Sequence, residues 1–129
     1  MSDRYEKGMK VLEITNKDTI QEVFKELEDI APDLGKFIVE FPYSEIYTRE
    51  CLDLKTRELI TVGALTALSN SEGQLKNHIN AALNVGNSPK EIVETIMQMS
   101  AYAGFPAAIN GIKAAKEIFK KRDLLPIDK

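Results

Sequence analysis

One apolar segment limits the folds open to this chain more than any other part of it. After Glu58, the sequence from Leu59 to Leu68 reads LITVGALTAL and contains hardly any polar side chain. Asp53 precedes this segment and is a favourable N-cap residue, so we expect a helix over residues 54–69. A helix that is apolar on every side has to be buried on every side. In a chain of 129 residues it must be central or covered by a second subunit, and we therefore expect an oligomer.

The rest of the sequence also has the pattern of helices. Apolar residues recur at three- and four-residue spacing, and no segment alternates convincingly between apolar and polar residues as a strand would. We therefore predict an all-α protein with a single domain over residues 1–129. The other predicted helices cover residues 4–14, 18–30, 32–41, 71–86, 88–104 and 108–119, and residues 42–51 are predicted to form an irregular connection.

Capping residues mark several of these helix ends. Asp18, followed by Gln21 at the third position, is the predicted N-cap of its helix. The signal at Ser88 is stronger, because a proline follows at the first helical position and Glu91 completes a capping box. This helix is expected to end around Gly104, where the sequence Gly-Phe-Pro interrupts the pattern.

The segment over residues 71–86 carries the only histidine of the chain, His78. Ser71 and Gln74 are spaced as a capping box, and Gly86 suits the left-handed position that ends a helix. The residues that share the helix face of His78 are Leu75, Ile79, Ala82 and Leu83. The histidine is therefore predicted to lie where a core residue is expected.

Charge and cysteine content argue against several classes of function. The chain has 17 basic and 20 acidic residues, a net charge of −3, and lacks the strongly basic character of nucleic-acid-binding domains. No window approaches the roughly 18 apolar residues of a membrane span, and the charged N-terminal sequence lacks the apolar core of a signal peptide. Cys51 is the only cysteine, so an internal disulfide cannot form. We expect a cytoplasmic protein without nucleic-acid or membrane partners.

Four motifs follow one another in the second half of the chain. They are Leu-Asp-x-x-Thr-Arg at residues 52–57, Leu-x-x-His-x-x-x-Ala-Leu at 75–83, Ser-Pro-x-Glu-Ile at 88–92 and Tyr-Ala-Gly-x-Pro-Ala-Ala at 102–108. In this ordered set, from Leu52 to Ile118, the chain resembles the carboxymuconolactone decarboxylase family and its AhpD-like fold. The resemblance implies an all-helical bundle that usually assembles as a homohexamer.

The resembled family includes more than one chemistry, because one fold can host several reactions. Its peroxidase-type relatives have a Cys-x-x-Cys pair at the positions that Ser71 and Gln74 occupy here. A hydroxyl and an amide cannot cycle between dithiol and disulfide, so self-contained peroxiredoxin activity is not expected. The other branch typically has Glu-Leu-x-x-His, and Gln74 departs from that pattern as well.

The resemblance implies a lyase that decarboxylates 4-carboxymuconolactone without a metal or an organic cofactor. Such an enzyme has to anchor a carboxylate, stabilise an oxyanion and return a proton. Arg57 is the candidate anchor, since a guanidinium pairs bidentately with a carboxylate. His78 is the candidate proton donor, because imidazole titrates near neutral pH, and Glu58 is the candidate that orients it. Gln74 and Tyr102 are the further candidates for substrate contacts.

Each candidate also has a structural interpretation. Arg57 and Glu58 suit the solvated first turn of a helix, His78 suits a buried histidine bonded to a backbone carbonyl, and Tyr102 suits ring packing. Two other functions also remain open. One is an alkylhydroperoxidase-type antioxidant that uses Cys51 or an external thiol, and the other is a non-catalytic hexamer that binds a ligand.

Overall fold

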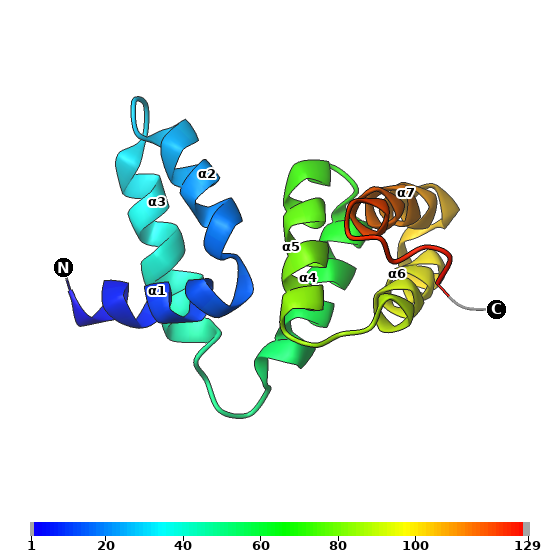
Figure 1. Cartoon of the computed structure of the whole chain (residues 1–129), viewed down its shortest axis with the longest axis horizontal. Coiled ribbons are helices and arrows are strands. Elements are labelled where there is room, and N and C mark those ends of the chain that lie inside the picture. The colour runs from blue at the N-terminus through cyan, green and yellow to red at the C-terminus, as the bar shows by residue number, and fades with distance from the viewer. Residues whose placement is uncertain (1, 128–129) are drawn as a thin grey trace. The chain divides into compact units, whose positions relative to one another are not determined.

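The structure, a computed structural model, describes residues 2–127 and contains only helices and their connections in that range (Figure 1). The all-α prediction is confirmed. The chain divides into two compact units, one ending at Leu54 and one beginning at Lys55. The helices are α1 (Asp3–Thr15), α2 (Lys17–Leu27), α3 (Pro32–Ile38), the π-helix η1 (Val39–Ile46), α4 (Leu54–Leu68), α5 (Glu72–Asn84), α6 (Pro89–Ala103) and α7 (Phe105–Lys121).

The first unit is built from α1, α2, α3 and η1. Helices α2 and α3 lie side by side (Figure 1), and α1 packs along η1. The contact between α1 and η1 is close at Gly8, where an added Cβ would overlap the carbonyl oxygen of Val39. Only a residue without a side chain therefore allows these two helices to approach. The buried core of this unit consists of Val11, Leu12, Ile20, Val39 and Tyr43.

The predicted irregular connection over residues 42–51 is wrong in its first part, because η1 continues as a helix to Ile46. Pro42 lies inside η1 and has no N–H to donate to the preceding turn. The chain widens here to a π-helix, in which the N–H of Tyr47 donates to the carbonyl of Pro42 over 2.8 Å. A wider turn thus keeps the segment helical around the proline.

The predicted start of the second helix is also wrong. Helix α2 begins at Lys17, and Asn16, rather than Asp18, is its N-cap residue. Asn16 is 95% buried and also ends α1, so the two helices share one junction residue. Asp18 lies in the first turn of α2, where a negative charge is favourable near the helix N-terminus.

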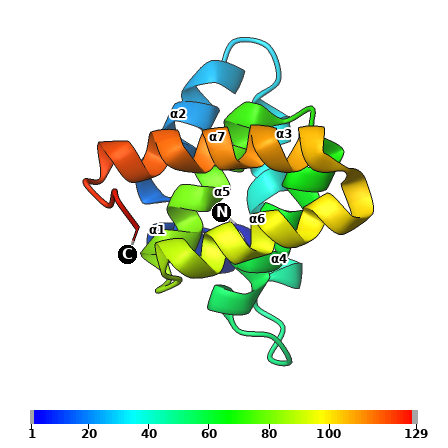
Figure 2. The ribbon, with the colours of Figure 1, turned by 90° about the vertical axis from the view of Figure 1, so that its right-hand side faces the viewer.

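The second unit contains α4 to α7. Helices α6 and α7 run antiparallel to each other, and both pack against α5 (Figure 2). Gly111 on α7 allows a close approach, because a Cβ there would lie 2.8 Å from Ile96 and 2.9 Å from Thr66. The buried core of this unit consists of Val62, Leu75, Ile79, Ala82, Ile92, Ile96, Ala114, Ala115 and Phe119.

The capping box that opens α6 is confirmed. Ser88 Oγ accepts from the N–H of Glu91 over 3.0 Å, and the Glu91 carboxylate accepts from the N–H of Ser88 over 2.9 Å. This second bond is the main cause that lowers the pKa of Glu91 from its ordinary value. The capping box predicted for α5 is wrong, since Ser71 makes no capping bond and its hydroxyl donates to Asn70 Oδ1 over 2.9 Å.

The end of α5 agrees with the prediction. Gly86 has a φ of +102°, which L side chains rarely adopt. Its N–H donates to the carbonyl of Leu83, and the next N–H, that of Asn87, donates to the carbonyl of Ala82. This is a Schellman motif, and it turns the chain from α5 towards α6.

The apolar helix α4 is only partly covered within the chain. Val62, Gly63 and Thr66 are buried, whereas Ile60 is 54% exposed and Leu68 is 62% exposed. The helix therefore presents an apolar stripe on its uncovered side. None of the helices within residues 2–127 is both long and apolar enough to cross a membrane.

Candidate functional site

Helices α4 and α5 bring together Glu58 and His78, two of the candidate site residues named from the sequence. Glu58 Oε1 lies 2.8 Å from Nδ1 of His78. The Glu58 side chain has no exposed area, and 13% of the His78 side chain is exposed. Glu58 is in the second turn of α4 and His78 in the middle of α5, so two rigid elements fix the distance between them.

This bond fixes the direction of the imidazole ring. A carboxylate only accepts hydrogen bonds, so the hydrogen lies on Nδ1 of His78 and is donated to Glu58. The other ring nitrogen, Nε2, is then left to bind or exchange a proton. A buried carboxylate also stabilises positive charge on the ring, as in other carboxylate–histidine pairs.

The second oxygen of Glu58 is unusual. Oε2 is buried and has no hydrogen-bond partner among the described residues. A buried charged group with an unsatisfied acceptor costs free energy, and such groups concentrate at functional sites. The buried position of the Glu58 carboxylate is therefore unfavourable for the stability of the fold, and it is consistent with a chemical role.

The other candidates have different surroundings. Arg57 precedes Glu58 in α4 and is half-buried, and because successive helical residues do not share a face it projects from another side of the helix. Gln74 is exposed in the first turn of α5. Tyr102 lies near the end of α6 and is 83% exposed. The structure thus joins His78 to Glu58, while Gln74 and Tyr102 face solvent in the single chain.

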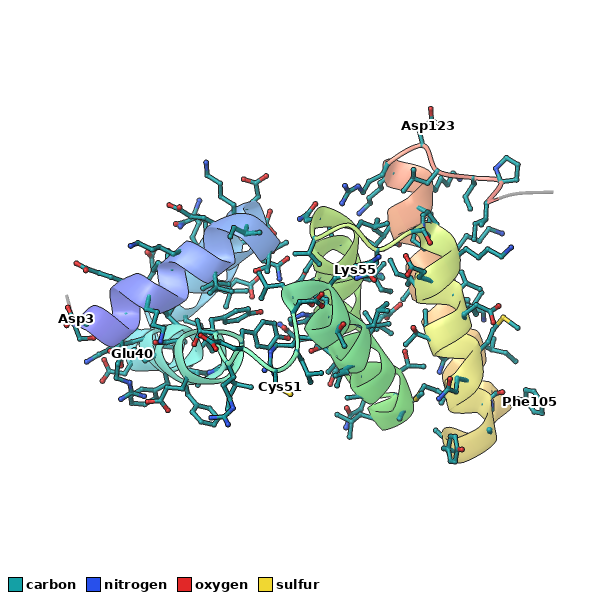
Figure 3. All side chains as sticks on the ribbon, turned by 90° about the horizontal axis from the view of Figure 1, so that it is seen from below. Asp3, Glu40, Cys51, Lys55, Phe105 and Asp123 are labelled. Atoms are coloured by element: carbon teal, nitrogen blue, oxygen red, sulfur yellow. The ribbon has the colours of Figure 1, made fainter. Side chains whose placement is uncertain are left out.

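The positions relevant to redox chemistry, Cys51, Ser71 and Gln74, do not provide a pair of thiols. Cys51 is exposed on the connection between η1 and α4 (Figure 3). Ser71 is bonded to Asn70, and Gln74 has an amide where a second thiol would be required. No dithiol can therefore form from the residues at these positions.

Asn87 is a buried polar residue that the sequence reasoning missed. Its Nδ2 donates to the carbonyl of Lys55 over 3.0 Å, and it thereby ties the loop after α5 to the first turn of α4. Its Oδ1 is buried without a hydrogen-bond partner among the described residues. The only sequence signal was its place after Gly86, where a polar residue is ordinary. Asn87 is positioned to hold the part of α4 that carries Arg57 and Glu58.

A cavity of about 360 Å³ lies where the end of α4, the start of α5 and the first half of α7 meet. Its lining includes Ser69, Leu75, Asn110 and Lys113, but neither His78 nor Glu58. Leu75 is one helical turn before His78 on the same face of α5. The cavity therefore extends to the turn of α5 before His78 but does not contain the Glu58–His78 pair.

Comparison with known proteins identifies the family. The model of the carboxymuconolactone decarboxylase family matches residues 32–117. The chain is 33% identical over 124 residues to a 4-carboxymuconolactone decarboxylase of Acinetobacter baylyi, covering 95% of this chain and 92% of that protein. It is 35% identical over 98 residues to an uncharacterised 15.0 kDa protein from the nqo9–nqo10 intergenic region of Paracoccus denitrificans. This match covers 75% of this chain and 73% of that protein.

A more distant relative carries a related name. The chain is 23% identical over 109 residues to a nitrosuccinic acid decarboxylase of Metarhizium robertsii, covering 84% of this chain and 76% of that protein. The family match spans well over half of the chain, and the Acinetobacter relative is similar over nearly its whole length. The chain belongs to the carboxymuconolactone decarboxylase family.

Proposed function

We propose that the protein is a cofactor-independent decarboxylase of a small carboxylated lactone such as 4-carboxymuconolactone. The observation that carries the proposal is the 2.8 Å bond between His78 and the fully buried Glu58. The relative named for this reaction supports the substrate class, since it is 33% identical over most of the chain. The second named decarboxylase supports the reaction type.

The chemistry of the substrate explains why the protein needs few groups. Loss of carbon dioxide leaves an electron pair that spreads onto the lactone carbonyl oxygen, because the leaving carboxylate is vinylogous to it. The pair returns to carbon when one proton is added, so each turnover releases one carbon dioxide and takes up one proton. The nitro group of nitrosuccinic acid can accept an electron pair in the same way. The enzyme must bind the acid, stabilise the oxyanion and deliver the proton.

His78 is assigned to the proton transfer. Because Nδ1 is bonded to Glu58, Nε2 is the atom that meets the substrate. When Nε2 carries a proton, the negative Glu58 stabilises the charged ring until the proton passes to carbon. The neutral ring then regains a proton from water. Glu58 acts only through His78 in this scheme.

Substrate binding is assigned to Arg57, Gln74 and Tyr102. The guanidinium of Arg57 pairs with the carboxylate that the substrate retains. Gln74 and Tyr102 have exposed side chains whose N–H and O–H groups can donate to the lactone oxygens. A residue exposed in the single chain is accessible to a ligand or to a neighbouring subunit.

The proposal includes assembly as a homohexamer. Ile60 and Leu68 leave an apolar stripe uncovered on α4, and Met97, Phe105 and Ile109 are each more than half exposed on α6 and α7. Large apolar side chains that are exposed in the single chain, when they lie together, are typical of surfaces that are covered in an assembly. This covering completes the burial that the sequence of α4 requires.

The test is to incubate the native protein with 4-carboxymuconolactone and follow both substrate loss and carbon dioxide release. The proposal predicts catalytic turnover with equal amounts of substrate lost and carbon dioxide formed. Binding of the substrate without turnover would instead favour the non-catalytic ligand-binding protein. No binding and no turnover would show that this lactone is not the substrate.

A parallel assay examines the antioxidant alternative. Native protein and a Cys51→Ser variant are compared for consumption of an alkyl hydroperoxide in the presence of an external thiol. We expect neither to consume peroxide above the background, because positions 71 and 74 carry no thiol. Consumption that Cys51→Ser abolishes would establish the redox function in its place.

A further inference from the structure

The first unit contains a cavity of about 490 Å³ that the proposed reaction does not use. Parts of α1, α2, α3 and η1 surround it, and all of its lining residues belong to this unit. Its volume is in the range of sites for small molecules. Its walls are largely apolar and include the rings of Tyr5 and Phe24 and the side chain of Leu27.

A carboxylate is fixed in the wall of this cavity. Glu40 lines the cavity although the residue is only 9% exposed. The hydroxyl of Ser2 donates to Oε2 of Glu40 over 2.7 Å and accepts from the backbone N–H of Tyr5. Figure 3 shows Glu40 on η1 close to α1. The carboxylate is therefore held in one direction by the start of α1.

This carboxylate has no counter-charge among the described residues. No lysine or arginine nitrogen within residues 2–127 lies within 4.0 Å of it, although Lys36 lines the same cavity. Arg4 is nearby, but it donates to the backbone carbonyl of Glu40 and pairs with the carboxylate of Glu45. A carboxylate buried without a cation is unfavourable, so a bound cation would complete the site.

The cavity has room for more than an inorganic ion. Gly35 exposes bare backbone in its wall, and a Cβ there would lie 3.0 Å from the ring of Phe24. Aromatic rings favour organic cations through their negative faces and their apolar area. The two acidic residues of the lining, Glu28 and Glu40, against the single Lys36 disfavour an anionic ligand.

We infer that this cavity binds a small organic ammonium ion, with the ammonium group on Glu40 and the apolar body between Tyr5 and Phe24. The inference does not depend on the reaction assigned to His78. It assigns the first unit a binding site of its own, distinct from the residues proposed for decarboxylation.

The first experiment needs only the native full-length protein. Benzylammonium is titrated and followed by amide NMR, and benzyl alcohol serves as a neutral probe of the same shape. We expect saturable shifts centred on the residues that line the cavity and an apparent Kd at least about tenfold lower for benzylammonium. Equal affinities for the two probes, or shifts centred elsewhere, would overturn the inference.

Variants then test whether binding depends on the Glu40 carboxylate and on the volume of the cavity. Glu40→Gln is expected to remove the preference for benzylammonium and to leave benzyl alcohol binding unchanged. The matched control is Glu45→Gln, which removes an exposed carboxylate outside this cavity and should keep the preference. Gly35→Ala narrows the cavity and should weaken the binding of both probes. Full benzylammonium affinity in both Glu40→Gln and Gly35→Ala would refute the site.

Discussion

At the scale of single residues, Glu58 and His78 are two candidate site residues that the structure brings into direct contact. A fully buried carboxylate with one unpartnered oxygen does not serve stability well, and it is bonded to the only histidine of the chain. The sequence suggested this pair, because His78 is the only histidine of the chain and Glu58 is a carboxylate on a neighbouring predicted helix that could orient its ring. It could not give the 2.8 Å distance, which depends on how α4 and α5 pack.

Substitution of Glu58 tests its role as a positioning residue. Glu58→Gln keeps the shape and one acceptor oxygen but removes the charge that stabilises the protonated ring. We expect kcat to fall by about tenfold or more with little change in KM. Steady-state kinetics on the lactone measure both values, and Glu94→Gln, an exposed change on α6, is the control. An unchanged kcat in Glu58→Gln would leave the residue a structural role only.

Arg57 is also tested at the scale of a single residue, but its proposed role is in substrate binding rather than in proton transfer. Arg57→Lys keeps the positive charge and loses the planar fork that binds a carboxylate at two points. We expect KM for the lactone to rise by about tenfold, and kcat to change less. The same kinetic assay decides the question. A KM equal to that of the native protein would place Arg57 outside the substrate site.

Gln74 and Ser71 illustrate what the sequence pattern gets wrong at this scale. Their spacing matches a capping box, yet Ser71 is bonded to Asn70 and leaves the start of α5 without a side-chain cap. The pattern gives only the spacing, whereas the bond depends on the backbone angles of the residue before the helix. At Ser88 the extended backbone suits the same pattern, and the box forms.

At the scale of helices, glycines decide how closely elements approach. In the sequence, Gly8 is only an unfavourable residue inside the predicted helix over residues 4–14, because glycine is a poor helix former. The structure shows why a glycine is needed at this position, since a Cβ there would overlap the carbonyl of Val39. The sequence could predict most helix boundaries, but the proline-containing turn of η1 and the contact at Gly8 depend on the partner element.

This contact gives a stability prediction with an internal control. Gly8→Ala should lower the free energy of unfolding by about 1–3 kcal/mol, because the overlap is with backbone and α1 must shift. Gly73→Ala in α5 meets nothing within 4 Å and should be neutral or stabilising by up to about 1 kcal/mol. Urea denaturation of both variants measures the difference. Equal stabilities would contradict the packing described for α1 and η1.

The capping box of α6 gives a prediction about pH. The N–H of Ser88 lowers the pKa of Glu91 from its ordinary value, so the folded state favours the charged carboxylate. This contribution is present above the pKa of the unfolded chain, about 4.5, and is lost as the pH falls through the lower folded value.

The measurement for this prediction is the unfolding free energy of native protein and Glu91→Gln between pH 7 and pH 3. The two stabilities should differ at neutral pH and converge in acid. Lys55, which lies 3.6 Å from Glu91, adds a smaller effect of the same sign. A difference that stays constant over this range would show that the ionised carboxylate of Glu91 does not stabilise the start of α6.

At the scale of the whole molecule, the sequence of α4 predicts more burial than a single chain provides. The run from Leu59 to Leu68 implies burial on all sides, and the single chain leaves Ile60 and Leu68 exposed. The unmet burial is the physical reason for the proposed homohexamer. Which faces meet in that assembly depends on surface shape, which the sequence pattern does not contain.

Light scattering coupled to size exclusion tests the assembly. The native protein should have a molar mass several times that of the 14.5 kDa chain, about sixfold for the proposed hexamer. A charge on the uncovered stripe, in the double variant Ile60→Glu and Leu68→Glu, should dissociate it, because charged residues are unfavourable in the core of an interface. A native protein that elutes as a monomer would contradict this account of α4.

The most direct test of the central claim is the kcat of a His78→Gln variant with 4-carboxymuconolactone. The glutamine amide can still donate to the buried Glu58, so the fold is expected to persist, as circular dichroism can verify. It cannot deliver a proton, and we predict that carbon dioxide release falls by about 100-fold or more. A folded His78→Gln variant whose kcat lies within about twofold of the native value would contradict the role assigned to the Glu58–His78 pair.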